Sequence, residues 1–345
     1  MSGLVDRLWY GRGRPLGFLA PLAWLYRAVS ERRRRAAWRA RNEPLPLPVV
    51  VVGNLTAGGT GKSPLTARLV KAMADRGWQP VILSRGYGGK AGHYPLLVTA
   101  DTPATDAGDE PVMLARETGV PVVVDPKRRR AAEWVVARQL GDVLICDDGL
   151  QHYPLPRDIE LAVFDGARGV GNGALIPVGP LREPISRLSG VDFVVVNGAA
   201  AAQPLGEGGR LTGFGDIEHP DMYPMTLTPS ALIHVRSGQR RPLSDLDGQS
   251  VHAIAGIGNP ARFFATLDAL GANVRATPFA DHHAFRASEL TTEPEEWLVM
   301  TAKDAVKCRD IAPDNAWYLA VEAQLPAAAL NAFLDRLAHC RSSVY

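Results

Sequence analysis

The chain has 345 residues, of which 46% are hydrophobic and 21% are charged, so it is long enough for about two domains with a sizeable core. This composition excludes a disordered chain and a fibrous repeat. The three cysteines (Cys146, Cys308 and Cys340) are widely spaced, which excludes a disulfide framework or a CxxC zinc site and favours a reducing compartment.

The net charge of +2 is unevenly distributed along the chain. Residues 1–41 contain ten arginines and two acidic residues, a net charge of +8, which leaves −6 for the rest. A basic segment on an acidic body indicates a local role for that segment, not a general affinity for nucleic acid.

Residues 1–43 are expected to form a basic, amphipathic, membrane-associating segment. Its apolar stretch, Pro15–Tyr26, spans about 18 Å as a helix, which is too short to cross a hydrocarbon core of about 30 Å. A secretory signal is also disfavoured, because Arg32–Arg35 stand where such a signal would have its small-residue cleavage site. Aromatic residues flanked by arginine favour a helix lying in the membrane interface; the alternative is a helix packed on the protein's own surface. These aromatic residues are Trp9, Tyr10, Phe18, Trp24 and Tyr26.

Residues 44–205 begin with the stiff linker Pro44–Pro48 and then alternate apolar runs with helical stretches. This alternation predicts a doubly wound, mostly parallel α/β sheet with helices on both faces. The predicted strands are Val49–Val52, Val81–Leu83, Val120–Val124, Val143–Cys146, Ile159–Phe164 and Phe193–Val196, and helices are predicted at Pro64–Arg76 and Arg129–Leu140.

A loop-rich stretch at Ala199–Pro229 indicates a transition to a second, smaller α/β lobe over residues 206–345. Its predicted strands are Val251–Ala255, Val274–Pro278, Trp297–Thr301 and Trp317–Val321, with helices near Ala261–Leu270 and over Pro326–His339.

A glycine-rich stretch between the first strand and the first helix of this sheet predicts a phosphate-binding loop. In such a loop, backbone N–H groups surround phosphate oxygens, a lysine neutralises them, and a hydroxyl contributes to a Mg²⁺ site. Lys62 and Ser63 fill these two positions, but Thr56 stands where GxxxxGK[ST] requires glycine. The predicted nucleotide-binding residues are Thr56, Ala57, Gly58, Gly59, Thr60, Gly61, Lys62 and Ser63.

Two further strand ends carry candidate motifs. Asp147 and Asp148 follow the strand Val143–Cys146, at the edge where open α/β sheets bind ligands, and this position suits a Mg²⁺ site. The GIGNPA stretch Gly256–Ala261 resembles a dinucleotide motif, but no acidic residue is well placed about twenty residues later. We therefore interpret it as a tight βα turn.

The order of the motifs resembles that of the tetraacyldisaccharide 4'-kinase family. The motifs are GNLTAGGTGKSP (Gly53–Pro64), SRGYGG (Ser84–Gly89), GDEP (Gly108–Pro111), DDGLQH (Asp147–His152), NGALIPVGPLREP (Asn172–Pro184), AGIGNPARFF (Ala255–Phe264), FADHHAF (Phe279–Phe285) and TAKDAVKC (Thr301–Cys308). The resemblance covers most of the chain between residues 9 and 310.

This resemblance implies an enzyme at the cytoplasmic face of the inner membrane that uses ATP and Mg²⁺. Its members transfer the γ-phosphate to the 4'-hydroxyl of an acylated glucosamine disaccharide 1-phosphate, forming the lipid IVA precursor of lipid A in lipopolysaccharide biosynthesis. The second lobe is expected to contribute to the acceptor site. An acyl-chain-bearing substrate would also explain the amphipathic segment.

The resemblance also implies roles for single residues. Asp109 is the implied catalytic carboxylate and His282 its partner, with His283 as the alternative. The implied Mg²⁺ ligands and the residues that support them are Ser63, Asp147, Asp148 and Glu183. The implied ligands of the phosphate or of the transition state are Arg182 and one of Arg129 or Arg128. Arg85 in the SRGYGG loop is a candidate substrate or phosphate contact, and Thr301–Lys307 is an adenine-side or structural candidate without an assigned role.

Two other functions remain open at this point. A nucleotide-hydrolysing switch would bind a protein partner, need no sugar acceptor and leave Asp109 dispensable, although no NKxD guanine motif is visible. A non-catalytic membrane scaffold would keep its function after Lys62→Ala.

Overall fold

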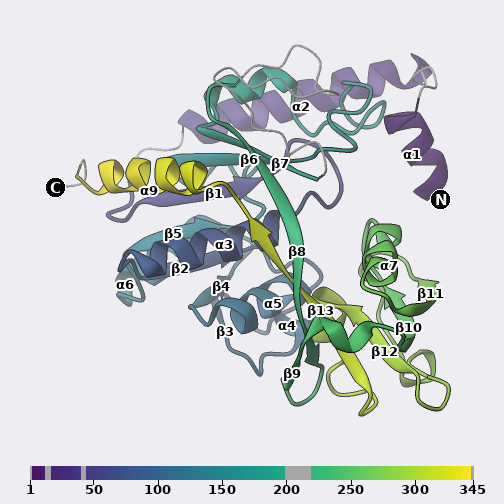
Figure 1. The fold of residues 1–345 in the computed structure, drawn as a ribbon. Helices are drawn as coiled ribbons and strands as arrows, with labels where there is room; N and C mark the ends of the chain where they lie inside the picture. The colour runs from purple at the N-terminus through teal and green to yellow at the C-terminus, as the bar shows by residue number, and fades with distance from the viewer. Residues whose placement is uncertain (1, 12–16, 40–43, 199–218, 343–345) are drawn as a thin grey trace. The chain divides into compact units, whose positions relative to one another are not determined.

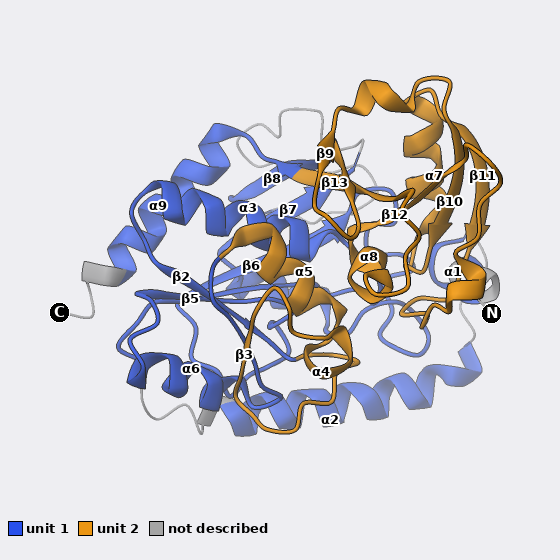
Figure 2. Cartoon of the chain, turned by 90° about the horizontal axis from the view of Figure 1, so that it is seen from below, with its two compact units in different colours: residues 1–85, 120–227, 323–345 blue, residues 86–119, 228–322 orange. Residues whose placement is uncertain are grey.

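The computed structural model describes residues 2–11, 17–39, 44–198 and 219–342. The chain divides into two compact units, each assembled from separate segments (Figure 2). Unit 1 comprises residues 1–85, 120–227 and 323–345, and unit 2 comprises residues 86–119 and 228–322. This division differs from the predicted boundary near residue 205, because the second unit also takes residues 86–119 and returns the C-terminal segment to the first.

Unit 1 is built on a parallel sheet of buried, valine-rich strands (Figure 1). The strand order is β8–β7–β6–β1–β5–β2–β4, and every pairing in this part is parallel. Continuous apolar runs are typical of strands covered on both faces. The strands are β1 (Val49–Gly53), β2 (Pro80–Ser84), β4 (Val122–Val124), β5 (Val143–Cys146), β6 (Ile159–Asp165), β7 (Phe193–Asn197) and the first part of β8 (Met222–His234).

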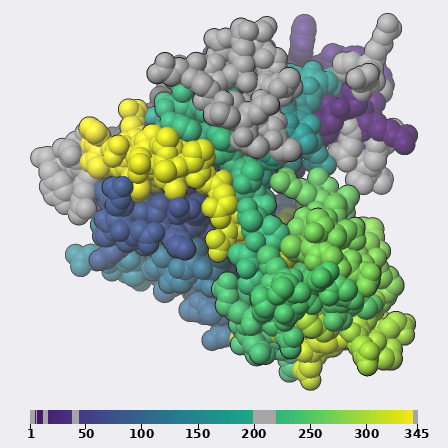
Figure 3. Space-filling view, viewed as in Figure 1, coloured from purple at the N-terminus to yellow at the C-terminus, as the bar shows by residue number. Residues whose placement is uncertain are grey.

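Helices cover both faces of this sheet. Helix α3 (Lys62–Asp75) packs on β1 and β2, and α6 (Arg128–Ala137) packs on β2 and β4. The crossovers through these helices run in opposite directions along the sheet, so right-handed connections place them on opposite faces. Helix α9 (Ala327–Ser342) lies along α3, and both are visible at the surface in Figure 3.

The N-terminal segment forms two helices, α1 (Ser2–Tyr10) and α2 (Ala20–Arg39). Among the described residues, no helix combines the length and the apolarity that crossing a bilayer requires.

Unit 2 contains a second run of strands, in the order β11–β10–β12–β13–β8, with β9 antiparallel to β8. The strands are β9 (Arg240–Arg241), β10 (Ser250–Ala255), β11 (Asn273–Pro278), β12 (Trp297–Thr301) and β13 (Ala316–Gln324), with the short β3 (Leu96–Val98) outside this run. Its helices are α4 (Ala104–Ala107), α5 (Asp109–Thr118), α7 (Pro260–Ala269) and α8 (Ala302–Cys308).

The predicted α/β class and all ten predicted strands are confirmed, with ends that shift by at most three residues. The stretch Ala199–Pro229 was predicted to be loop-rich. Residues 199–218 lie outside the described part of the chain, but from Met222 the prediction was wrong, because strand β8 begins there. Pro224 and Pro229 argue against a strand in the sequence, yet β8 pairs with β7 with Pro224 opposite Val196.

Candidate active site

The phosphate loop joins β1 to α3 and is tied to a second segment of unit 1. Thr56 forms a β-bridge with Leu181, so it lies in extended backbone and needs no glycine. The left-handed backbone falls instead on Gly58 (φ +109°) and Gly61 (φ +93°). The departure from the usual spacing at Thr56 therefore leaves the loop with the glycines that it needs.

Hydrogen bonds hold the end of the loop against β7. Asn197 donates from Nδ2 to the carbonyl oxygen of Thr60 (3.1 Å), and a Cβ on Gly61 would lie 2.7 Å from that same nitrogen. Asn54 donates to the carbonyl oxygen of Gly58 (3.0 Å). The loop is thus preshaped, and glycine at position 61 is required by both its φ angle and the close approach of Asn197.

Three cations surround Asp148 (φ +49°), directly after β5. Lys62 Nζ lies 3.6 Å and Arg182 Nη1 3.4 Å from Asp148 Oδ1, and Arg128 Nη2 donates to the Asp148 carbonyl oxygen (3.0 Å). Burial raises the pKa of Asp148, but the charges of Lys62, Arg182 and Arg128 outweigh it and hold the pKa below its ordinary value. A non-glycine residue in the left-handed region is strained, as often occurs at functional sites.

Asp147 is 2% exposed and accepts hydrogen bonds from two hydroxyls of α3. Ser63 Oγ donates to Asp147 Oδ2 (3.1 Å) and Thr66 Oγ1 donates to Oδ1 (3.0 Å). Ser63, Asp147 and Asp148 present hard oxygen atoms beside the phosphate loop. This donor set is the kind that Mg²⁺ prefers when a nucleotide supplies further oxygens.

Glu183 contacts two side chains beside the phosphate loop. Its Oε1 accepts a hydrogen bond from Gln151 Nε2 (2.8 Å), and its Oε2 lies 3.6 Å from Arg187 Nε. Gln151 in turn faces Arg182, with 3.5 Å between Oε1 and Nη1. Because Glu183 is occupied by these partners, its visible contacts support Gln151 and Arg182, not the Ser63–Asp147 pair.

The arginines of the RRR run are separated by their positions on α6. Arg128 is buried and reaches Asp148, whereas Arg129 pairs with Glu133 across one helical turn (2.9 Å). The structure therefore brings Arg128 to the phosphate site in place of the predicted Arg129. Arg85 is exposed directly after β2, and its charge is one of those acting on His152.

In unit 2, Asp109 and His282 form a hydrogen-bonded pair. Asp109 is the first residue of α5 and is 5% exposed, and its Oδ2 lies 3.1 Å from His282 Nδ1. The preceding Gly108 has φ +89°, and a Cβ there would lie 2.5 Å from the carbonyl oxygen of Tyr87. The neighbouring His283 points to Glu289 instead (3.0 Å). Of the two candidates, His282 is thus the partner of Asp109.

The backbone of His282 (φ +60°) is held by the other motifs of unit 2. Its N–H donates to the carbonyl oxygen of Gly256 (3.2 Å), and the Gly256 N–H donates to Asp304 Oδ2 (3.0 Å). Asp304 is fully buried and also accepts from Thr301 Oγ1 (2.7 Å) and pairs with Lys307 (2.8 Å). The GIGNPA stretch (Gly256–Ala261) is therefore the predicted βα turn, between β10 and α7. Together with Asp304 of the TAKDAVKC motif, it holds the backbone of His282 in place.

Lys303 on α8 is a residue of this site that the sequence analysis left without a role. Its Nζ lies 3.3 Å from Glu110 Oε1, 3.5 Å from Asp281 Oδ1 and 3.2 Å from His282 Nε2. Burial alone lowers the pKa of Lys303, but the surrounding carboxylates outweigh it, so its pKa lies above the ordinary value. The only sequence sign is a lysine just past a buried strand, at the edge where parallel sheets place ligands.

Three aromatic residues of the N-terminal segment bind the loops of the phosphate site. Tyr10 donates to the carbonyl oxygen of Ala57 (3.3 Å) and Tyr26 to that of Arg182 (3.0 Å). Trp9 Nε1 donates to the carbonyl oxygen of Pro177 (3.1 Å). These contacts match the alternative of a helix packed on the protein's own surface.

The other two predicted aromatic anchors face outward. Phe18 is 75% exposed and Trp24 is 79% exposed, and Leu22 and Leu25 beside them are also exposed. The N-terminal segment therefore has one face that contacts the loops of the phosphate site and one apolar face that no described residue covers.

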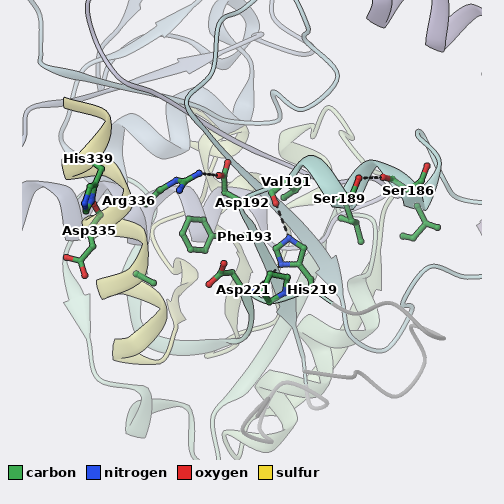
Figure 4. A pocket seen from close by; sticks show the side chains of 14 residues that line it. Ser186, Ser189, Val191, Asp192, Phe193, His219, Asp221, Asp335, Arg336 and His339 are labelled. Atoms are coloured by element: carbon green, nitrogen blue, oxygen red, sulfur yellow. Dashed lines mark hydrogen bonds and ion pairs between the residues drawn. The ribbon is translucent and has the colours of Figure 1, made fainter. Parts of the chain in front are cut away.

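A cavity of about 910 Å³ elsewhere in unit 1 contains none of the predicted site residues (Figure 4). Arg336 on its rim pairs with Asp192 (3.0 Å), and the buried His219 is bonded to the carbonyl oxygen of Val191 (2.9 Å). Two of its polar side chains are thus engaged, Arg336 with Asp192 and His219 with the backbone.

Comparison with known proteins identifies the family of the chain. The family model of LpxK, tetraacyldisaccharide-1-P 4'-kinase, matches residues 16–339. The tetraacyldisaccharide 4'-kinases of Azotobacter vinelandii and Pseudomonas putida F1 are 48% and 47% identical, each over 96% of both chains. A crystal structure of LpxK from Aquifex aeolicus in complex with ATP is 26% identical, covers 94% of this chain and 98% of its own, and superposes with a TM-score of 0.75. The chain belongs to the tetraacyldisaccharide-1-P 4'-kinase family.

Proposed function

We propose that the protein transfers the γ-phosphate of ATP to the 4'-hydroxyl of a tetraacyldisaccharide 1-phosphate. The observation that carries this proposal is the phosphate loop ending at Lys62 and Ser63, beside Asp147 and Asp148, in a chain of this kinase family. The reaction forms a bond between the sugar oxygen and the γ-phosphorus and breaks the bond from that phosphorus to the oxygen retained by ADP. The hydroxyl proton must pass to a base.

In this proposal the loop residues Thr56–Ser63 bind the phosphates through their backbone N–H groups at the start of α3. Lys62, Arg182 and Arg128 supply positive charge where the transition state concentrates negative charge. Because phosphoryl transfer passes through a loose transition state, alignment and charge neutralisation supply most of the acceleration. Arg85 is a further proposed phosphate or substrate contact.

Ser63, Asp147 and Asp148 would hold Mg²⁺, since Ser63 Oγ contacts Asp147 Oδ2 and Asp148 Oδ1 lies 3.6 Å from Lys62 at the end of the loop. When bound, Mg²⁺ neutralises charge on the phosphate oxygens. Asp147 would orient Ser63, and Glu183 would act indirectly by holding Gln151 against Arg182.

Asp109 is the proposed base for the sugar hydroxyl. Its carboxylate is oriented by His282 and lies at the N-terminus of α5, where the helix stabilises negative charge. A positioned base of this kind typically contributes a factor of about 10² to 10⁴ to the rate. The proton of the hydroxyl would pass to Asp109 as the oxygen attacks phosphorus.

The exposed face of α2 is the proposed contact with the membrane, at the cytoplasmic face of the inner membrane. Leu22, Trp24 and Leu25 present apolar side chains there, Phe18 is exposed in the turn Gly17–Leu19 that precedes α2, and Arg32–Arg35 follow on the helix. Apolar side chains with nearby arginines are typical of helices that lie in the interface of anionic membranes.

The test is a transfer assay with γ-labelled ATP and a tetraacyldisaccharide 1-phosphate in mixed micelles. Wild-type protein should label the lipid, and Lys62→Ala should lower the rate at least several hundredfold, consistent with the loss of about 3–4 kcal/mol of transition-state stabilisation. Lys71→Ala, an exposed lysine on the same helix α3, is the matched control and should retain the wild-type rate. Unchanged transfer by Lys62→Ala would contradict the proposed role of the loop.

A further inference from the structure

The imidazole ring of His282 has a different neighbour at each nitrogen. Nδ1 lies 3.1 Å from Asp109 Oδ2, and Nε2 lies 3.2 Å from Lys303 Nζ. A lysine ammonium has three donors and no acceptor. The hydrogen bond between Lys303 and His282 therefore requires Nε2 to be the acceptor, which places the ring proton on Nδ1, where it is donated to Asp109.

The charges around the ring keep Lys303 in the ammonium form. Its side chain is 16% exposed and lies among three carboxylates, those of Glu110 (3.3 Å), Asp281 (3.5 Å) and Asp109 (4.0 Å). Asp281 Oδ1 also lies 4.0 Å from His282 Nε2. This ammonium is already matched by negative charge, which distinguishes it from a lysine held ready for a substrate phosphate.

The remaining neighbour of the ring is uncharged. Tyr87 lies with its ring centroid 5.1 Å from that of His282, at an interplanar angle of 60°. The charged groups facing His282 are thus Asp109 from α5, Asp281 from its own loop and Lys303 from α8. Lys303 is the cation in contact with the ring.

We propose that Lys303 is a positioning residue that fixes His282 in the Nδ1–H form and keeps it uncharged, so that Asp109 remains the carboxylate that accepts the sugar proton. The catalytic consequence rests on the proposed kinase function; the tautomer does not. A protonated His282 would form an ion pair with Asp109 and weaken it as a base. Lys303 thus acts through His282 and needs no contact with substrate.

Removal of Lys303 has a defined consequence. In Lys303→Met, Asp109 and Asp281 face the ring without a cation, so His282 takes up a proton at higher pH. We expect the lower limb of the kcat profile to move upward by about one pH unit, a tenfold change in proton affinity. Lys303→Arg should retain most of the wild-type profile, because guanidinium also only donates.

The tautomer can be measured without substrate. In protein labelled with ¹⁵N-histidine, long-range proton–nitrogen spectra distinguish a protonated nitrogen from an accepting one, and His282→Gln assigns the signal among the eight histidines. We expect wild-type His282 to carry its proton on Nδ1, and the midpoint of its titration to rise by about one unit in Lys303→Met. Lys71→Met removes an exposed lysine elsewhere and should leave both values unchanged.

Two results would overturn the proposal: a wild-type His282 protonated on Nε2, or the same titration midpoint in Lys303→Met as in wild type. If Lys303→Met does not fold, the proposal is still tested by the tautomer of His282 in the wild-type spectrum and by the pH profile of Lys303→Arg. Failure to phosphorylate the glycolipid would remove the proposed function while leaving the spectra interpretable. The two hypotheses can therefore fail separately.

Discussion

His152 is a single side chain whose burial makes stability depend on pH. Burial, with the charges of Arg128, Arg157 and Arg85, lowers the pKa of His152 to about 4 from an ordinary 6.5. Between these values the unfolded chain binds a proton that the folded chain does not, so this contribution is complete above pH 6.5 and is lost as the pH falls toward 4. The loss amounts to roughly 3 kcal/mol.

The measurement is the free energy of unfolding of wild type and His152→Gln between pH 7.5 and 5. Glutamine cannot titrate, so the variant should lose less stability than wild type over this range. His339, which is exposed, provides the control His339→Gln, which should follow the wild-type curve. Parallel curves for wild type and His152→Gln would show that His152 titrates normally.

At the residue scale, the sequence predicted which residues lie together where the backbone context fixes their position. Lys62, Ser63 and Asp147 follow from a glycine-rich loop between strand and helix and from a strand end, both of which have a defined geometry. Arg128 could not be chosen over Arg129, because adjacent residues of a helix point in directions about 100° apart and only the packing of α6 decides which faces Asp148. Lys303 was missed because its partners come from distant segments.

Among the elements, α5 and β8 show why pattern alone was insufficient. Helix α5 is only ten residues long, and Pro111 near its start hides a helical pattern, although acidic residues and proline suit a first turn. Strand β8 contains two prolines and is stabilised by pairing with β7 and β13, which no local pattern records. Longer elements with strong periodicity, such as α3 and α9, were predicted.

The N-terminal helices have two separable faces, which leads to a prediction with matched variants. Replacing Phe18 and Trp24 together by serine should lower binding to phosphatidylethanolamine–phosphatidylglycerol vesicles at least tenfold, because each buried aromatic ring is worth about 1.5–3 kcal/mol. ATP affinity should stay at the wild-type value, since both rings are exposed and neither contacts the phosphate loop. Vesicle co-sedimentation and nucleotide titration measure the two affinities.

Tyr26→Phe is the matched control on the inner face. It removes the hydrogen bond to the Arg182 carbonyl while keeping the ring, so it should leave vesicle binding unchanged. Equal vesicle affinity of wild type and the serine double variant would exclude this face as the membrane contact. Deleting residues 1–41 would not separate these effects, because it also removes the contacts of Tyr10 and Tyr26 with the phosphate-site loops.

On the scale of the whole molecule, the chain passes between its two units four times. Sequence patterns alone give no information on contacts between distant segments, so consecutive elements were assigned to the same lobe and two successive lobes were predicted. Residues 86–119, which carry Asp109, instead belong with the unit that carries His282. The phosphate loop and the Asp109–His282 pair are thus each complete within one unit.

Asp109→Asn tests whether the second unit takes part in chemistry. The amide keeps the shape but cannot accept the proton, so kcat for lipid phosphorylation should fall by about 10² to 10⁴ with little change in the KM for ATP. Steady-state kinetics with varied ATP and glycolipid separate the two parameters. An effect on KM alone would identify Asp109 as a binding residue.

The most direct test of the account is the fate of the γ-phosphate. Purified protein is given γ-labelled ATP, Mg²⁺ and a tetraacyldisaccharide 1-phosphate, and labelled lipid and free phosphate are both quantified. We predict nearly one phosphorylated lipid for each ATP consumed, and little consumption when the lipid is omitted. Free phosphate as the only labelled product, with or without the lipid, would contradict the account.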